Sequence, residues 1–214
     1  MKNHKTLSQG SLEWHEIKWG KIGGTLSKGL FVKSDTLLID ILSQKIEEFE
    51  PADSFESEAM ERGKELEPFA IEYLETYVKT KFEKSGWLQC EKNELLGISP
   101  DAISECETVG AEIKCLGRKK HIEVLLANEI PLDYIFQCVH YFTVNPKLEK
   151  LHFFAYRPES IKNFHKELTR ESLVNLGTKA KPVLKTVVEW SEIARNEADL
   201  LLKQINEKIE NLKF

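Results

Sequence analysis

The order of the predicted elements indicates an α/β protein, in which helices flank a mixed β-sheet and a long helix closes the chain. Helical spacing of apolar residues dominates before residue 80. Short β-type runs separated by turn residues follow between residues 87 and 115. After residue 131 a helical segment, a β-type run and a helical tail succeed one another. A chain of 214 residues suits one sizeable core and leaves little room for a second domain, so we expect 1–214 to be a single domain.

Two helices are predicted in the first part of the chain. Residues 34–49 begin with Ser34 or Asp35 as a cap and carry a regular apolar stripe, namely Leu37, Leu38, Ile41 and Leu42. Residues 55–80 place Met60, Gly63, Leu66, Ala70, Leu74 and Tyr77 along one side. Pro68 lies inside this second helix and should kink or restart it, because proline lacks the backbone N–H.

The β-type runs are short, and two further helices follow them. We expect strands at Trp87–Cys90, Leu95–Ile98, Ala102–Ser104, Ala111–Cys115 and Leu151–Tyr156. Residues 131–143 have helical spacing. From about Pro182 to Phe214 one long amphipathic helix is predicted, with Val183, Val187, Trp190, Ala194, Ala198, Leu201, Ile205, Ile209 and Leu212 on its apolar side.

Composition and charge narrow the function classes. No apolar run approaches the ~20 residues that span a bilayer, and the N-terminus lacks the apolar segment of a signal peptide. These features predict a cytoplasmic protein that does not bind membranes. The net charge of −5 and the pI of about 5.8 are weak indications against nucleic-acid binding. However, Arg118, Lys119 and Lys120 form a local basic stretch that is either a phosphate contact or an ordinary solvated face.

The four cysteines do not predict a metal centre. They occupy positions 90, 106, 115 and 138 without CxxC pairing and without histidines at ligand spacing. Cys115 and Cys138 lie among apolar residues and are interpreted as buried free thiols. A structural zinc or an iron–sulfur cluster is therefore not expected.

Asp101, Glu112 and Lys114 form the constellation that predicts chemistry. Side chains alternate along a strand, so Glu112 and Lys114 share one face while Ala111 and Ile113 point to the other. If Asp101 lies on the adjacent strand of a hairpin, its carboxylate can meet Glu112. Two carboxylates with a backbone carbonyl are ligands that Mg²⁺ selects, and a nearby lysine can stabilise negative charge or help to deprotonate water. The alternative is an exposed hairpin with ordinary charged side chains.

Two helix residues are candidates for the same site. Glu67 lies beside the buried stripe of its helix, where a carboxylate needs a metal or a basic partner unless it reaches water. Gln137 has Tyr134 and Tyr141 at i−3 and i+4, which suits the lining of a cleft as well as a simple core. Two other functional classes are not supported. The glycines at 20, 23 and 24 lack the spacing of a P-loop, and the signature of a zinc deaminase is absent from the sequence.

Five sequence blocks in a fixed order resemble one family. They are Ser11–His15, Lys18–Thr25, Met60–Ala70, Gly97–Asp101 with Glu112–Lys114, and Pro131–Gln137. The chain resembles the phage lambda exonuclease group, the YqaJ-like viral recombinase domain, among the PD-(D/E)XK nucleases. The resemblance covers a motif-bearing core of about 11–157 and leaves a helical extension of about 158–214 unassigned.

The resemblance implies a restriction-endonuclease-like core and a set of site residues. Asp101 and Glu112 would be the metal ligands, assisted by the Ile113 carbonyl. Lys114 would be the catalytic lysine, and Glu67 and Gln137 would support the site. The implied cofactor is Mg²⁺, with Mn²⁺ as a substitute.

The implied activity is 5′→3′ digestion of one strand of duplex DNA from its ends. The 3′ single-stranded tail would pass to a single-strand annealing protein during recombination. The family also suggests a homotrimeric ring and a gene of phage or prophage origin, expressed in the cytoplasm of a bacterial host. The long C-terminal helix would either cap the core or help to build that ring.

The N-terminal motif departs from the family pattern. Lys18 and Thr25 stand where the family tends to have arginine and serine, and lysine keeps the charge but loses the two-pronged hydrogen bonding of arginine. Between them, the glycines at 20, 23 and 24 allow the backbone to wrap a 5′-phosphate. The alternative is a tight turn with an exposed lysine.

Two other functions stay open. One is an endonuclease or a RecB-type repair nuclease of the same fold, and cleavage of closed circular versus linear DNA would separate the endonuclease from an exonuclease. A catalytically inactive DNA-binding or assembly module is disfavoured because Asp101, Glu112 and Lys114 are all present.

Overall fold

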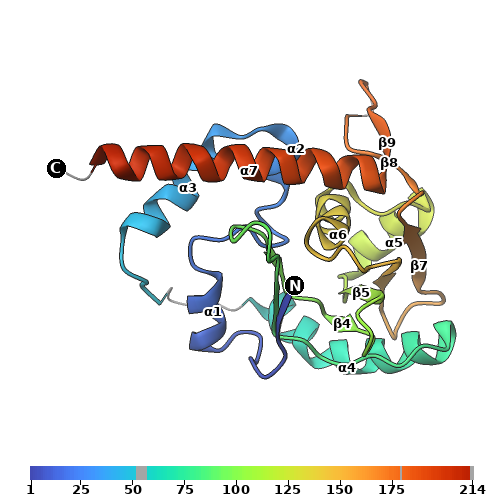
Figure 1. The fold of residues 1–214 in the computed structure, drawn as a ribbon. Helices are drawn as coiled ribbons and strands as arrows, with labels where there is room; N and C mark the ends of the chain where they lie inside the picture. The colour runs from blue at the N-terminus through green and yellow to red at the C-terminus, as the bar shows by residue number, and fades with distance from the viewer. Residues whose placement is uncertain (52–56, 179, 213–214) are drawn as a thin grey trace.

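A computed structural model describes residues 1–51, 57–178 and 180–212. Helices α4 and α6 enclose the central sheet, and α7 lies beyond α6 (Figure 1). The elements in chain order are β1 (Lys2–His4), α1 (Leu12–Lys18), α2 (Lys28–Val32), α3 (Asp35–Ile46), α4 (Glu58–Val78), β2 (Trp87–Gln89), β3 (Gly97–Ile98), β4 (Ala102–Ile103), β5 (Val109–Lys114), α5 (Arg118–Ala127), α6 (Leu132–Val144), β6 (Lys150–Ala155), β7 (Phe164–Thr169), β8 (Leu173–Asn175), β9 (Leu184–Thr186) and α7 (Val187–Leu212).

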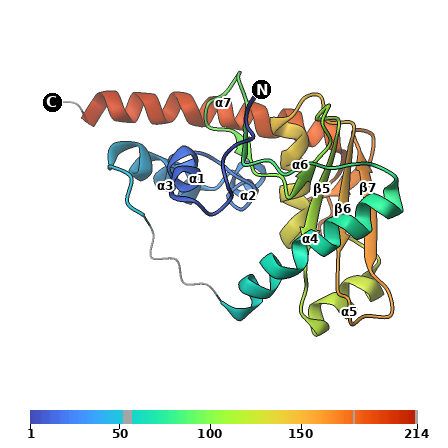
Figure 2. The same cartoon turned by 90° about the horizontal axis from the view of Figure 1, so that it is seen from below.

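The central sheet has the order β4-β5-β6-β7 and is mixed, as predicted. Strands β5 and β6 are parallel, with Glu112 opposite Phe153, and the other two pairs are antiparallel. Ala111 and Ile113 pack toward α4, where they meet Ala70 and Leu74. Glu112 points the other way, toward α6. The predicted alternation along this strand is therefore confirmed, and α4 crosses the sheet on the face opposite α6 (Figure 2).

A second sheet, β1-β2-β3, holds the N-terminal segment beside the central sheet. Ile22 adds a parallel bridge to Leu96. The buried His140 of α6 lies with its Nε2 3.1 Å from the Ile22 carbonyl oxygen and 3.0 Å from that of Gly97. Burial lowers the pKa of His140 to about 4, so the ring is neutral and can donate one N–H. This contact fixes the segment after α1 against α6.

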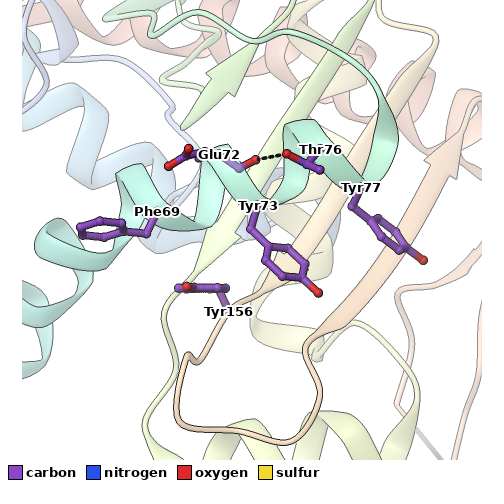
Figure 3. A pocket seen from close by; sticks show the side chains of 6 residues that line it. All are labelled: Phe69, Glu72, Tyr73, Thr76, Tyr77 and Tyr156. Atoms are coloured by element: carbon purple, nitrogen blue, oxygen red, sulfur yellow. Dashed lines mark hydrogen bonds between the residues drawn. The ribbon is translucent and has the colours of Figure 1, made fainter.

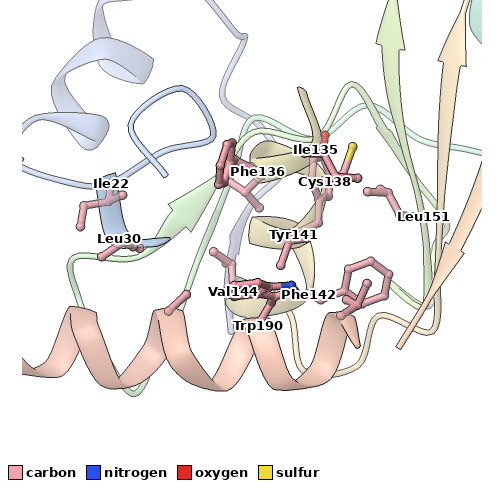
Figure 4. Close-up of a cluster of buried hydrophobic side chains, with 14 of the residues drawn as sticks. Ile22, Leu30, Ile135, Phe136, Cys138, Tyr141, Phe142, Val144, Leu151 and Trp190 are labelled. Carbon is pink, nitrogen blue, oxygen red and sulfur yellow. The ribbon is translucent and has the colours of Figure 1, made fainter. Parts of the chain in front are cut away.

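Helix α7 packs along α6, α2 and α3 and completes the main core (Figure 4). The predicted stripe is confirmed over most of its length, because Val187, Trp190, Ala194, Ala198, Leu201 and Ile205 are buried. The predicted start at Pro182 is wrong. Val183 is 44% exposed, and residues 184–186 form β9. Thr186 and Glu189 then cap the helix reciprocally, so α7 begins at Val187. Leu212 is exposed, and Phe214 lies outside the described residues.

Helix α4 differs from the prediction at three points. It starts at Glu58, and residues 55 and 56 lie outside the described part of the chain. It continues through Pro68 without restarting; the proline is exposed, so solvent can replace the missing hydrogen bond. Met60 and Tyr77 were expected on the buried side but are 53% and 61% exposed. Ala70 and Leu74 are fully buried, as predicted.

The remaining predictions are confirmed with shifted ends, and several short elements were not predicted. Helix α3 spans Asp35–Ile46, with Leu37 and Ile41 buried. The structure adds β1, α1, α2, α5, β7, β8 and β9. Cys138 is buried and Cys115 half-buried, both as free thiols. None of the helices in the described residues combines the length and apolar character that a membrane-spanning helix needs.

Candidate active site

Glu112 is a fully buried carboxylate in the middle of β5. Its Oε2 accepts hydrogen bonds from the Gln137 amide at 2.8 Å and from the Tyr141 hydroxyl at 2.7 Å. Its Oε1 contacts the Lys114 ammonium. A carboxylate with this much burial needs such partners, and here three side chains supply them. The structure therefore brings Glu112, Lys114 and Gln137 together, as the sequence suggested.

Asp101 joins this group from the turn before β4. Its Oδ2 accepts a hydrogen bond from the Ile113 backbone N–H at 2.6 Å, which places the carboxylate beside β5. Burial raises the pKa of Asp101 well above its ordinary range, and the negative charge of Glu112 raises it further. The positive charge near Asp101 therefore does not fully offset the effects of burial and of Glu112 on its pKa.

Lys114 ends β5, and its ammonium contacts the Glu112 carboxylate. Burial alone would lower its pKa, but the charges of Glu112 and Asp101 outweigh burial and raise the pKa above its usual value. The amine is therefore an ammonium at neutral pH. Of the two roles considered for this lysine, stabilising negative charge fits that protonation state better than accepting a proton.

Glu67 approaches the site from α4. Its side chain is 32% exposed, and its carboxylate lies 3.9 Å from the Lys84 ammonium. Burial is the main cause of its raised pKa, which Lys84 and Lys114 partly offset and Glu112 reinforces. The charge of Glu67 in turn raises the pKa of Asp101, so the two carboxylates influence each other.

The N-terminal motif lies against the same site. Lys18 is half-buried at the end of α1, and burial lowers the pKa of its amine to about 8. A Cβ on Gly24 would be only 2.7 Å from Cγ of Gln137, so the backbone at this point touches the side chain that holds Glu112. Thr25 follows in an exposed turn.

The three basic residues Arg118, Lys119 and Lys120 lie in the first turn of α5, and their surroundings differ. Lys120 pairs with Asp133 at 3.2 Å, and its ammonium lies 6.0 Å from the centre of the Tyr134 ring. The Lys114 ammonium lies 5.5 Å from the same ring, so Tyr134 connects Lys120 to the site. Arg118 and Lys119 are exposed to solvent.

The roles of Tyr141, Trp14 and Trp87 were not predicted from the sequence. Tyr141 was treated as a flanking aromatic, but it donates a hydrogen bond to Glu112. Its position one helical turn after Gln137 could have indicated this role. Trp14 and Trp87 surround the Lys18 ammonium at 3.3 and 5.9 Å from their ring centres. Only the i, i+4 spacing of Trp14 and Lys18 hinted at that contact.

A separate cavity of about 630 Å³ lies along the outer side of α4. It is lined by Phe69, Glu72, Tyr73, Thr76, Tyr77 and Tyr156 (Figure 3). Glu72 is the only acidic or basic residue in this lining. The cavity therefore lacks a set of catalytic groups, and the candidate centre is at β5.

The residues at β5 fit a hard divalent cation. Within residues 1–51, 57–178 and 180–212, no three His, Cys, Asp or Glu side chains converge closely enough to hold a metal ion together. Asp101 and Glu112 would supply two oxygen ligands and a backbone carbonyl a third. Mg²⁺ usually keeps several waters and needs few protein ligands. The raised pKa of Asp101 also indicates that added positive charge would be favourable here.

The fold and the site define a mixed α/β protein with two carboxylates and a lysine gathered on one strand. A family model for the YqaJ-like viral recombinase domain matches residues 13–147. The chain belongs to this family, which confirms the resemblance found in the sequence.

The solved structures extend the likeness to nearly the whole chain. An alkaline exonuclease from Laribacter hongkongensis, LHK-Exo, superposes with a TM-score of 0.74 at 20% sequence identity, covering 95% of this chain and 96% of that one. The same enzyme in complex with dAMP gives a TM-score of 0.72, with the same identity and coverage. The α/β fold with its long C-terminal helix is therefore that of LHK-Exo. No curated protein matches the sequence.

Proposed function

We propose that this chain is a Mg²⁺-dependent exonuclease that digests one strand of duplex DNA in the 5′→3′ direction and leaves 3′ single-stranded tails. The observation that carries the proposal is the convergence of Asp101, Glu112 and Lys114 at β5. The family is one of viral recombinases, and the structurally similar LHK-Exo is an alkaline exonuclease. LHK-Exo has been crystallised with dAMP, a mononucleotide of the kind that exonucleolytic cleavage would release.

Asp101, Glu112 and the Ile113 carbonyl would hold the metal, with Mn²⁺ as a substitute for Mg²⁺. The bound ion would supply a Lewis acid that offsets phosphate charge and lowers the pKa of a coordinated water. Lys114, as an ammonium, would stabilise the negative charge that develops on the phosphate oxygens. Gln137 and Tyr141 keep the Glu112 carboxylate in one orientation, and Glu67 adds negative charge at the edge of the site.

Two further groups would position DNA. Lys18 and Thr25 would contact the 5′-phosphate, since the glycines at 23 and 24 bring this segment beside Gln137. Arg118, Lys119 and Lys120 would contact the DNA backbone without reading sequence. In the cell, a phage- or prophage-encoded protein of this kind would act in the bacterial cytoplasm as a homotrimer, and a single-strand annealing protein would receive the tails.

Digestion of linear duplexes labelled at either end, with Mg²⁺ or with EDTA, tests the proposal. We expect loss of the 5′-terminal nucleotides first, only with Mg²⁺, and no cleavage of closed circular DNA. Cleavage of the circle would instead identify an endonuclease. Binding of duplex DNA without cleavage of any substrate would identify an inactive binding module.

A further inference from the structure

Lys18 is a half-buried cation without a carboxylate partner among the described residues. Buried ammonium groups are ordinarily paired, because losing water is costly for a charge. Here two aromatic rings take that place. The ammonium lies 3.3 Å from the centre of the Trp14 ring and 5.9 Å from that of Trp87. A ring face attracts a cation but does not neutralise it, so the charge stays available to an anion.

Hydrogen bonds fix the orientation of the Trp14 ring. Its indole N–H is shared between the Ser99 hydroxyl at 2.8 Å and the Gly86 carbonyl oxygen at 3.0 Å. A Cβ on Gly86 would lie 2.3 Å from the Leu7 carbonyl oxygen, so the chain passes here too closely for any other residue. Ser99 stands two residues before Asp101. The ring that carries Lys18 is thus tied to the segment that presents a candidate metal ligand.

The Lys18 side chain also lies close to the glycine segment that contacts Gln137. A Cβ on Gly23 would lie 3.9 Å from Cε of Lys18, and the next residue, Gly24, abuts Gln137. Gln137 in turn holds Glu112. Lys18 is therefore linked through Trp14 to the segment of Asp101, and through the Gly23–Gly24 segment to the helix that orients Glu112.

We infer that Trp14 is a positioning residue for recognition of the 5′-phosphate: its ring holds the Lys18 ammonium unpaired, and its N–H keeps that ammonium in register with the Asp101 segment. This inference rests on the proposed function. It assigns to Trp14 no contact with DNA and no part in the cleavage step.

The test compares linear duplexes of one sequence with a 5′-phosphate or a 5′-hydroxyl. Trp14→Leu keeps apolar volume but removes the ring, so the preference for the phosphorylated end should fall roughly tenfold, mainly through KM. Trp14→Phe keeps a ring face and loses the N–H, and should retain the larger part of the preference. Trp19→Leu, at a tryptophan of the same segment that bonds the Glu47 carbonyl instead, is the matched control and should leave the preference unchanged.

An unchanged preference in Trp14→Leu would overturn the inference. Trp14→Phe losing as much as Trp14→Leu would overturn the role of the ring face and leave only that of the indole N–H. A wild-type protein that degrades DNA without any end preference would overturn it while leaving the nuclease proposal intact. If the wild-type protein cleaves nothing, the proposed function fails. Fluorescence anisotropy of the two duplexes in EDTA then tests Trp14 by binding alone, with the same ranking of variants expected.

Discussion

At the scale of single residues, an ionised Asp101 would serve metal binding but would lower the stability of the fold. Burial and Glu112 raise its pKa, so its ionised form is disfavoured in the folded protein. A folded pKa above the unfolded one means that stability is present at low pH and is lost as the pH rises through the folded value. Asp101→Asn should therefore abolish cleavage and yet raise the melting temperature in EDTA at neutral pH, by about 2–4 °C per kcal/mol.

The same variant also tests the metal. Wild-type protein should melt at a higher temperature with excess Mg²⁺ than in EDTA, because the ion binds only the folded state. Asp101→Asn and Glu112→Gln should lose that increase, whereas Glu67→Gln should lose only part of it. Thermal unfolding monitored by circular dichroism measures both effects. Normal cleavage by a folded Asp101 or Glu112 variant would remove these residues from the site.

Lys18 gives a pH dependence at the same scale. Burial lowers the pKa of its amine to about 8, so the ammonium is present below that pH and is lost above it. The preference for 5′-phosphorylated ends should accordingly decline as the pH rises through about 8. Lys18→Arg, whose guanidinium stays charged, should keep its preference at alkaline pH. Ratios of initial rates across this pH range measure the effect, and parallel profiles for the two proteins would contradict it.

Residue type and spacing predicted which side chains gather at β5, but they did not predict every contact of those side chains. Strand alternation was enough to put Glu112 and Lys114 on one face. The protonation state of Lys114 depends on burial and on the charges of Glu112 and of Asp101, which lies in the turn before β4. Likewise, the contact of Lys18 with Trp87 joins residues far apart in the chain. Such contacts have no local sequence pattern.

At the scale of elements, the segment of Gly23 and Gly24 is a spacer between α1 and α6. A methyl group on Gly24 would meet three atoms of the Gln137 side chain at 2.7 to 3.0 Å. Gly24→Ala should therefore displace Gln137 from Glu112 and reduce turnover roughly tenfold or more, although no catalytic group is changed. Steady-state kinetics on linear duplexes measures this loss.

Gly63→Ala in α4 is the matched control for that substitution. Nothing lies within 4 Å of a Cβ at this position, and alanine favours the helix by about 0.5–1 kcal/mol. We expect unchanged turnover and slightly higher stability. Equal losses in the two variants would show that Gly24 has no special relation to the site.

Element boundaries show where sequence patterns lose their power. The spacing of Thr186 and Glu189 is that of a capping box and marks the true start of α7. However, the apolar residue Val183 fits the helical stripe, so the predicted helix began too early and included residues of β9. Helix α1 has only seven residues, none of them buried, so periodicity had nothing to detect. Long elements with a buried stripe, such as α3 and α7, were predicted because packing and pattern coincide.

At the scale of the whole molecule, the question about α7 is whether it caps the core or forms an interface between subunits. Its main apolar stripe, Val187, Trp190, Ala194, Ala198, Leu201 and Ile205, is already buried in the same chain, where α7 contacts α6, α2 and α3, and Leu200 and Leu212 are exposed. This favours a capping role over an apolar interface between subunits. The single-domain organisation stays a prediction, and these contacts agree with it.

A substitution on each side of α7 separates the two roles. Ile205 is fully buried, so Ile205→Ala should destabilise the protein by about 2–5 kcal/mol. Lys203 is exposed on the same helix, and Lys203→Glu should change stability by less than about 0.5 kcal/mol.

If α7 only caps the core, both proteins should sediment with the same oligomeric state as the wild type. We expect that state to be a trimer at micromolar concentration, by analytical ultracentrifugation. A trimer that Lys203→Glu dissociates would place α7 in the interface, and a wild-type protein that stays monomeric with and without DNA would end the ring proposal.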